Sequence, residues 1–409
     1  MAEGERVVID RMGHQGDGIA VADGEQVYIP YTLPGETVMI SRAGERGALR
    51  ENVSPSPERI APICRYFGVC GGCALQHWRQ ENYRAWKRDL VVAALAHEGV
   101  DAPVGDLVDA HGEGRRRIVL HARRTREDIA VGFMAHRSHT LVAIDHCPVL
   151  APALARAFAI GARIALALAT NDKPLDLQFT ATEGGLDVDV RGSGPLAAAA
   201  RSSLAGIAAE ERLARLTRHG EIVAQLAEPA LQVGRSRVVL PPGAFLQATD
   251  AGENALAAIV GEAAAGASKI ADLFCGVGPF ALRLAENARV LAVDGDAAAI
   301  GALARAAKAP GLKPVEATTR DLFRRPLAAA ELKGFDAVVL DPPRQGAEAE
   351  ARALARSAVP RLIYVSCNPA SFARDARILC AGGYRLAGVT PVDQFRYSAH
   401  VELVGVFER

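Results

Sequence analysis

Four short apolar runs in the last third of the chain constrain the fold more than any other feature. Each run is followed by a turn and a helical stretch; the runs are SKIADLF, ARVLAVD, FDAVVLD and RLIYVSC. Strands that are apolar on both faces are typical of parallel sheets covered by helices on both sides. We therefore predict a doubly wound, mostly parallel α/β sheet over residues 236–409.

The remaining sequence predicts two further domains, since 409 residues exceed the length of one ordinary domain. Residues 1–56 contain short strand-like runs split by glycine-rich turns, which favours a small β-barrel. Residues 57–235 mix strand-like runs with Ala/Leu-rich segments and predict an α+β middle domain. The helical part near residues 80–110 is a candidate for packing on the C-terminal domain instead.

Charge and hydropathy say more about the cellular location of the protein than about which molecule it binds. Basic and acidic residues number 47 each, so no global positive field indicates a nucleic-acid partner. The first ten residues lack the apolar core of a secretory signal, and the apolar stretch of residues 151–170 is interrupted by Arg156 and Arg163. We expect a cytoplasmic protein without membrane spans, monomeric and with no obligate protein partner.

Residues at the ends of the first two runs predict a ligand crevice, because the carboxyl ends of parallel strands meet at one edge of a sheet. In the turn DLFCGVGPF, Gly276 and Gly278 would let the backbone approach a ligand. Ala281 stands where a GxGxxG fingerprint needs its third glycine, which argues against NAD and for a different adenosine cofactor. Asp294 suits either the hydroxyls of a ribose or the cap of the following helix.

Two later loops extend this crevice. Asp321 follows the third strand region, and Asp341-Pro-Pro-Arg344 follows the fourth. The proline pair is expected to stiffen a loop that forms a wall beside a flat base, in preference to merely ending a strand.

A cysteine at the end of the last run is the predicted nucleophile. Cys367 precedes Asn368-Pro369 at an expected helix start, and a helix N-terminus lowers the pKa of a thiol. Cys275 and Cys380 are interpreted as small buried hydrophobic residues. Glu402, in the expected final strand, is the candidate carboxylate, although alternation alone favours an exposed glutamate at a sheet edge.

Together these residues resemble the bacterial RNA uracil-C5 methyltransferases, specifically the 23S ribosomal RNA branch with an N-terminal TRAM domain and an iron–sulfur cluster. The resemblance runs almost end to end. Its most specific motifs are GHQGDGIA and VYIPYTLPGETV for TRAM, SPER and C-x5-C-G-G-C for the cluster, and FLQ, DLFCGVG, LDPPR, YVSCNP and DQF…HVE. It implies a class I S-adenosylmethionine-dependent methyltransferase fold behind an OB-like TRAM barrel and the middle domain.

The resemblance also implies roles for single residues. Cys367 would add to carbon 6 of a uracil in RNA, and Glu402 would remove the proton from carbon 5 after methyl transfer. The implied contacts to S-adenosylmethionine, beside the two turn glycines, are Gln247, Phe274, Asp294, Asp321 and Asp341.

Four cysteines are the implied metal ligands, namely Cys64, Cys70, Cys73 and Cys147. Their spacing alone fits a [4Fe–4S] cluster and tetrahedral zinc equally. The proline after Cys147 and the resemblance favour the iron–sulfur cluster, with a role in folding or RNA positioning.

The sequence departs from the family pattern at several positions. Pro279 and Thr249 stand where asparagine is usual, and Asp294 and Asp321 stand where glutamate and asparagine are usual. Arg396-Tyr397-Ser398 replaces a Pro-His-Thr stretch near the base, which leaves the target nucleotide open.

The RNA surface is less well defined by the sequence. An acid-free basic stretch is interpreted as a solvated face more readily than as a phosphate-binding site; it comprises Arg115, Arg116, Arg117, Arg123, Arg124 and Arg126. The alternatives are a transfer-RNA uracil methyltransferase with the same chemistry and a non-catalytic iron–sulfur RNA-binding protein. A cytosine-C5 enzyme would need a second cysteine in the Asp341 loop, which has none.

Overall fold

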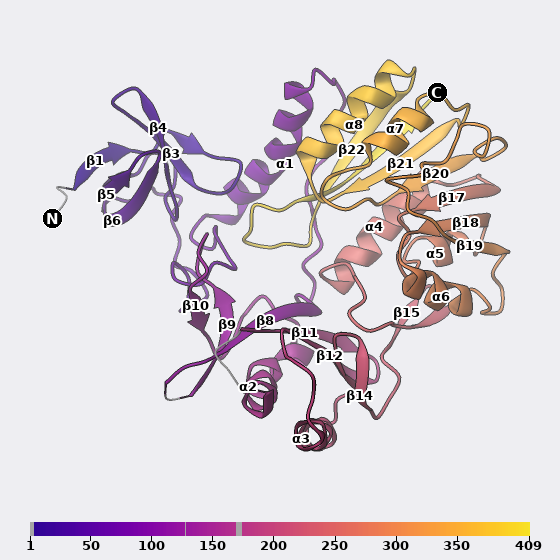
Figure 1. The fold of residues 1–409 in the computed structure, drawn as a ribbon. Helices are drawn as coiled ribbons and strands as arrows, with labels where there is room; N and C mark the ends of the chain where they lie inside the picture. Colours follow the sequence, from indigo (N-terminus) through magenta and orange to yellow (C-terminus); the bar gives the residue numbers. More distant parts are fainter. Residues whose placement is uncertain (1–3, 127, 169–173) are drawn as a thin grey trace.

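The computed structural model describes residues 4–126, 128–168 and 174–409. The first three residues of the predicted barrel and the last two of the apolar stretch 151–170 lie outside this part. Figure 1 shows three regions in chain order, with the N-terminal strands, the middle sheet and the C-terminal sheet each lying apart from the others.

The N-terminal strands form a six-stranded sheet in the order β1-β5-β6-β4-β3-β2. β1 also packs against β3, so the sheet curls on itself around Val27, Ile29, Val38 and Ile40. The strands are β1 Glu5–Val8, β2 Arg11–Met12, β3 Gly18–Ala22, β4 Glu25–Ile29, β5 Thr37–Ala43 and β6 Arg46–Ser54.

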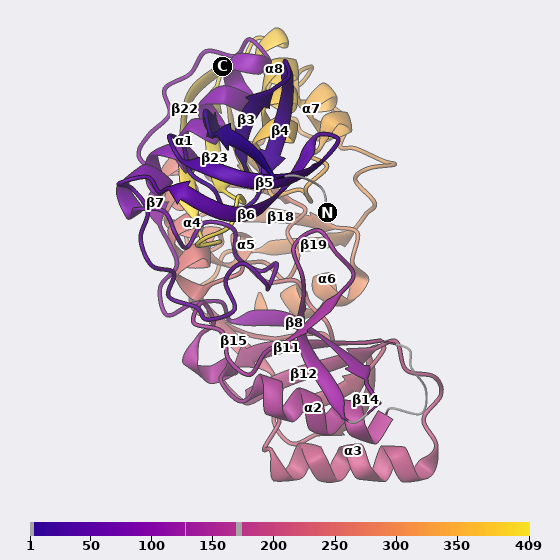
Figure 2. The same ribbon diagram turned by 90° about the vertical axis from the view of Figure 1, so that its left-hand side faces the viewer.

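The middle region is a seven-stranded sheet in the order β10-β9-β8-β11-β12-β13-β14. Figure 2 shows its two α-helices, α2 and α3, together on one side of the sheet. Its elements are β8 Arg117–Arg124, β9 Ile129–Met134, β10 Leu141–Ala143, η1 Pro152–Leu154, α2 Ala157–Leu168, β11 Leu175–Thr182, β12 Gly185–Arg191, α3 Ala198–Glu210, β13 Arg215–Arg218 and β14 Glu221–Gln225. α2 lies in the predicted apolar stretch and buries one face, led by Phe158, Ile160 and Ile164.

The C-terminal sheet has eight strands in the order β19-β18-β17-β20-β21-β23-β22-β7. β17 to β21 run parallel, and β23 lies antiparallel between β21 and β22. The strands are β7 Val108–Asp109, β17 Lys269–Leu273, β18 Arg289–Asp294, β19 Val315–Thr319, β20 Ala337–Leu340, β21 Arg361–Ser366, β22 Arg385–Asp393 and β23 Glu402–Glu408. The predicted doubly wound parallel sheet is thus confirmed.

Helices cover both faces of this sheet, and a hydrophobic core fills each side. They are α1 Gln80–His97, α4 Asp250–Ala263, α5 Ala281–Leu284, α6 Ala297–Ala306, α7 Glu348–Leu354 and α8 Pro369–Ala381. α1 packs against α8, and β7 pairs with β22, so residues 80–109 add to the C-terminal sheet region. A hairpin of β15 Ala230–Val233 and β16 Ser236–Val239 packs on α6.

The strand order reverses between β17 and β20, which is where open α/β sheets place their ligands. β17, β18, β20 and β21 all point their carboxyl ends at the same edge. Within the described ranges, every helix is too short or too polar to cross a membrane.

Candidate active site

A cavity of about 440 Å³ opens at this edge of the C-terminal sheet. Its volume lies within the range of small-molecule sites. It brings together most of the predicted site residues, namely Gln247, Phe274, Gly276, Asp294, Asp321, Asp341, Cys367 and Glu402. Gly278 does not line this cavity. Below, it is called the donor cavity.

The glycine turn after β17 shapes one wall of the donor cavity. Gly276 has φ +53°, and a Cβ there would meet nothing within 4 Å, so its backbone can approach a ligand. Gly278 has φ +91°, and a Cβ there would lie 2.7 Å from Leu303 Cδ1. We conclude that Gly278 serves the packing of α6, a role different from the predicted ligand contact. The Phe274 ring beside the turn packs on Phe323, with ring centroids 5.3 Å apart.

Asp294 fixes the turn from the end of β18. Its Oδ2 accepts a hydrogen bond from Gly276 N at 2.9 Å, and its Oδ1 accepts one from Asp296 N at 2.7 Å. The helix-cap alternative for Asp294 is wrong, because Asp296 caps α6 by accepting from Ala298 N and Ala299 N. A carboxylate has further lone pairs beyond these two bonds, so it can still accept hydroxyl donors from a ligand.

Two acids lie at the other end of the donor cavity. Glu402 begins β23, which has a neighbour on each side, and the residue is only 4% exposed. The expectation of an exposed edge glutamate is therefore wrong. Burial raises the pKa of Glu402 to about 7, against the lowering effect of a hydrogen bond from Gln394. Burial, followed by the charge on Glu402, raises the pKa of Asp341 well above its ordinary value.

Amide side chains connect these acids. Gln247 Nε2 donates to Asp341 Oδ2 at 3.1 Å, and Gln394 Nε2 donates to Glu402 Oε1 at 3.1 Å. Gln394 Nε2 also donates to Gln247 Oε1 at 2.6 Å. The role of Gln394 was missed by the sequence, where it is only the second residue of DQF; nothing local shows that its side chain turns toward a distant glutamate.

Cys367 follows β21 and is partly buried. Burial raises the pKa of its thiol to about 12, and the charges of Glu402 and Asp341 act in the same direction. The predicted depressed pKa at a helix N-terminus is therefore wrong for the free protein, although α8 does begin at Pro369 under an Asn368 cap. Cys275 is buried as predicted, and Cys380 packs partly buried on the hydrophobic core beside α8.

A second cavity, of about 980 Å³, meets the donor cavity at Arg344 and Cys367. Its walls come from three parts of the chain: the N-terminal region with His14, the cysteine-rich segment with Gly71, and α1. The loop before β23 and Arg137 of the middle region complete it.

The predicted basic stretch is partly internal. Arg116 is buried, and its guanidinium contacts Glu253 at 2.5 Å. Arg117 lies over the Phe245 ring and Arg115 over the Phe395 ring, at 4.9 and 5.7 Å from the centroids. Arg116 and Arg117 therefore support the donor-cavity walls through Glu253 and Phe245. For Arg116 the interpretation as part of a solvated face is wrong.

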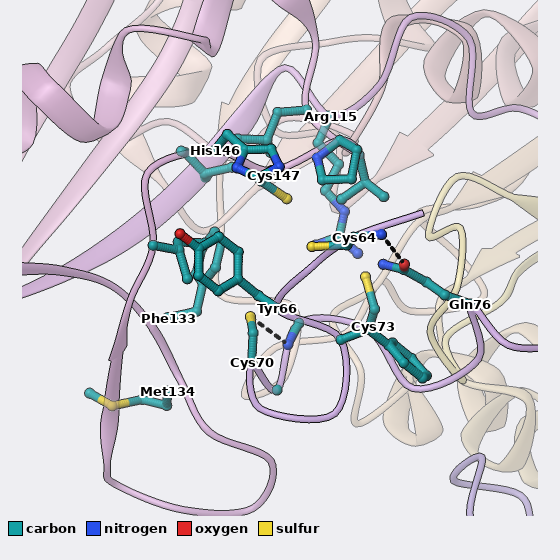
Figure 3. Close-up of a pocket in the computed structure, with 18 of the residues that line it drawn as sticks. Cys64, Tyr66, Cys70, Cys73, Gln76, Arg115, Phe133, Met134, His146 and Cys147 are labelled. Carbon is teal, nitrogen blue, oxygen red and sulfur yellow. Dashed lines mark hydrogen bonds between the residues drawn. The ribbon is translucent and has the colours of Figure 1, made fainter. Parts of the chain in front are cut away.

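Four cysteine side chains gather in a separate cavity of about 400 Å³. Figure 3 shows the sulfurs of Cys64, Cys70, Cys73 and Cys147 around one space, with Arg115 at its edge. All four thiols are free, and burial raises the pKa of Cys147 to about 12. In the described part of the chain, no three His, Cys, Asp or Glu side chains meet the geometry for holding a metal ion.

The departures from the family pattern have structural roles. Thr249 caps α4 by accepting from Gly252 N at 2.8 Å and donates to Ala110 O at 2.6 Å. Tyr397 adopts φ +64°, and its carbonyl accepts hydrogen bonds from Ala74 N and Leu75 N. The loop before β23 is thus joined directly to the cysteine-rich segment.

Comparison with known proteins agrees with this geometry. The family model for tRNA (Uracil-5-)-methyltransferase matches residues 243–409. An uncharacterized RNA methyltransferase of Brucella suis is 46% identical over 405 residues, covering 99% of this chain and 98% of the relative. One from Caulobacter vibrioides is 47% identical over 412 residues, covering 98% and 99%.

Two further similarities concern proteins with stated RNA targets. The 23S rRNA (uracil(1939)-C(5))-methyltransferase RlmD of Halomonas elongata is 34% identical over 439 residues, covering 100% of this chain and 90% of that protein. The solved structure of Pyrococcus abyssi tRNA (uracil-54, C5)-methyltransferase with S-adenosyl-L-homocysteine aligns with a TM-score of 0.74 and 23% identity. It covers 98% of this chain and 100% of that one, a likeness of fold.

Proposed function

Because the chain belongs to the RNA uracil-C5 methyltransferase family and is an RNA methyltransferase, we propose that it methylates 23S ribosomal RNA with Cys367 as nucleophile and Glu402 as base. The observation that carries the proposal is the position of both side chains on one cavity wall. They come from β21 and β23, strands that pair side by side, and they face the donor cavity with Asp341.

Each residue has one task in the reaction. The Cys367 thiolate forms a bond to carbon 6 of the uracil, and the electron pair of the C5–C6 double bond makes carbon 5 an enolate nucleophile. S-adenosylmethionine supplies the methyl group, which carbon 5 accepts while S-adenosylhomocysteine leaves. Glu402 then takes the proton from carbon 5, the double bond re-forms, and the cysteine sulfur is expelled.

The pKa values of the free protein suit the last step better than the first. A base works best when its pKa lies near the working pH, and burial places the pKa of Glu402 at about 7. The thiol, with a pKa of about 12, is protonated until substrate arrives. The thiol must lose this proton to solvent as RNA binds before the thiolate can attack carbon 6, and until then the cysteine stays unreactive.

The donor cavity fits S-adenosylmethionine in its chemistry. Asp294 at the end of β18 can accept ribose hydroxyls, and the open backbone at Gly276 leaves room for close approach. Phe274 and Phe323 supply aromatic surface for an adenine. Pro279 lines the cavity without a side-chain donor, so the amide contact of the usual asparagine is replaced by apolar surface.

The test of the chemistry is a pair of cysteine variants. Cys367→Ala is expected to abolish transfer of labelled methyl groups to uracil in RNA, because no covalent intermediate can form. Cys380→Ala, a partly buried cysteine of α8 that does not line the donor cavity, should retain activity. Full activity of Cys367→Ala would support a different nucleophile or a non-catalytic role for this cavity.

The choice of 23S ribosomal RNA rests on the full-length similarity to the Halomonas enzyme, at 34% identity. The transfer-RNA alternative is favoured by the fold of the Pyrococcus protein, at 23% identity. Mapping 5-methyluridine in both RNAs from cells with and without this protein discriminates the two. Loss of the modification from transfer RNA alone would refute the ribosomal assignment.

We also propose that the four-cysteine cavity holds a [4Fe–4S] cluster through Cys64, Cys70, Cys73 and Cys147. Four free thiols around one space fit its donor set. Zinc, with Zn–S bonds of about 2.3 Å, would require the sulfurs to approach within about 4 Å of one another. When bound, it would cross-link the cysteine-rich segment to the middle region.

Iron and sulfide analysis of anaerobically purified protein tests this assignment. Cys147→Ser should lose the visible absorbance and lower the melting temperature, whereas stoichiometric zinc in the wild type would refute the cluster. The TRAM identity and RNA-binding role of residues 1–56, the other domain boundaries, the monomeric state and the cytoplasmic location stay predictions.

A further inference from the structure

Among the described residues, Gln394 is the one whose side-chain amide contacts both Glu402 and Gln247. It is fully buried and lies in the loop between β22 and β23. Three of its four hydrogen-bonding positions are in use, since Oε1 accepts from Ala248 N at 2.8 Å while Nε2 donates to Gln247 and to Glu402.

The backbone fixes which way this amide faces. An N–H group at Ala248 can only donate, so the Gln394 oxygen must face it and the two N–H groups must face the other side. Gln247 then presents its oxygen to Gln394 and its own N–H groups to Asp341. Both acids of the site therefore receive an amide donor, and the direction of every bond follows from one backbone group.

A second set of contacts fixes the loop itself. Lys87 of α1 is fully buried, and its Nζ lies 2.5 Å from Asp393 Oδ1 and 3.0 Å from Phe395 O. Tyr83 of the same helix donates to Asp393 Oδ2 at 2.6 Å and accepts from Tyr397 N at 2.9 Å. The residues on both sides of Gln394 are thus held by one helix.

We infer that Gln394 is a positioning residue whose loop is held by Lys87 and Tyr83. Gln394 orients the Glu402 carboxylate and connects it through Gln247 to Asp341. This inference rests on the proposed role of Glu402 as base. It assigns to α1 a part in the reaction, although no residue of α1 lines the donor cavity.

The positioning has an electrostatic consequence. Burial raises the pKa of Glu402, and the Gln394 hydrogen bond opposes that rise because it favours the charged form. The titratable and charged groups near Glu402 are Asp341 from the β20 loop, Cys367 from the end of β21, Asp393 at the end of β22 and Arg344. Asp341 and Cys367 are acids that would make ionisation of Glu402 harder, the positive charge of Arg344 acts in the opposite direction, and Asp393 is already paired with Lys87.

The test is the pH profile of Gln394→Met in the full-length protein with an RNA substrate. Loss of one hydrogen bond to a charged group should move the inflection in the pH profile of the elimination step upward by about one to two pH units relative to the wild type. At pH 7 the variant should release product about tenfold or more slowly and accumulate a covalent RNA adduct at Cys367, and activity should recover at pH 9. Gln178→Met, a partly buried glutamine of β11, is the matched control.

Tyr83→Phe keeps the inference testable if Gln394→Met does not fold, because it removes one hydroxyl and preserves the packing. It should shift the inflection in the same direction by a smaller amount. An unchanged inflection in either folded variant, even with a reduced rate, would overturn the inference. Absence of uracil methylation by the wild type at every pH would instead defeat the proposed function.

Discussion

Replacing Glu402 by glutamine should stabilise the protein while stopping turnover. In the folded protein burial raises the pKa of Glu402 to about 7, against an ordinary value of 4.5. Each pKa unit corresponds to about 1.4 kcal/mol, so the ionised carboxylate lowers the free energy of unfolding by about 3 kcal/mol above pH 7. Glutamine keeps the size of the side chain and an oxygen that can accept from Gln394.

The sign of the pH dependence follows from proton binding. Between pH 4.5 and 7 the folded protein holds a proton on Glu402 that the unfolded chain has released, so the wild type loses stability as the pH rises through this window. Below pH 4.5 the Glu402 carboxyl is protonated in both the folded and the unfolded protein, so its titration does not lower the free energy of unfolding. Glu402→Gln lacks this titration, so its advantage should grow from near zero at pH 4.5 to its full value above pH 7.

Urea unfolding and thermal melting at pH 5 and pH 8 measure the effect. The expected gain at pH 8 corresponds to roughly 6–12 °C in melting temperature for a domain of this size. Glu408→Gln is the matched control, because Glu408 ends the same strand with its side chain 44% exposed in an ion pair with Arg385. Equal melting temperatures of wild type and Glu402→Gln at pH 8 would show that burial of the ionised Glu402 carboxylate does not destabilise the folded protein.

Two further substitutions test the packing behind the donor cavity. Gly278→Ala should lower the free energy of unfolding in urea by about 1–3 kcal/mol, because φ is +91° and the new Cβ would lie 2.7 Å from Leu303 Cδ1. The control Gly261→Ala, where a Cβ in α4 would meet open space, should be neutral or stabilising. Equal effects of the two substitutions would contradict this reasoning. Arg116→Met should lower the free energy of unfolding by about 3 kcal/mol, because the buried Glu253 loses one ion-pair partner. The double variant Arg116→Met/Glu253→Gln should lose less stability than the sum of the two single losses. Strictly additive losses would rule out this coupling.

Much of the donor cavity could be predicted from the sequence because its residues occur at the ends of consecutive strands. Gly276, Asp294 and Asp341 each close an apolar run, and parallel strands bring such ends together without any knowledge of long-range pairing. The same local signals placed Cys367 at the end of β21.

The burial of Glu402 and the pKa of Cys367 could not be predicted in this way. Whether Glu402 is buried depends on β23 entering the sheet between β21 and β22, a pairing that alternation in one strand does not encode. Burial raises the pKa of Cys367, and the carboxyl groups of Glu402 and Asp341 add to this, so its helix N-terminus alone gave the wrong sign. Arg116 is buried because Glu253, far along the chain, lies opposite.

The arrangement of the two cavities also bears on how the enzyme is loaded. Within the described residues, Arg344 and Cys367 are the points at which the cavities touch, and their other walls are built from different segments. On the proposed function, a methyl donor in the first cavity and a nucleotide in the second would reach the thiol of Cys367 from different sides. Cys367 is thus the residue at which the two reactants would meet.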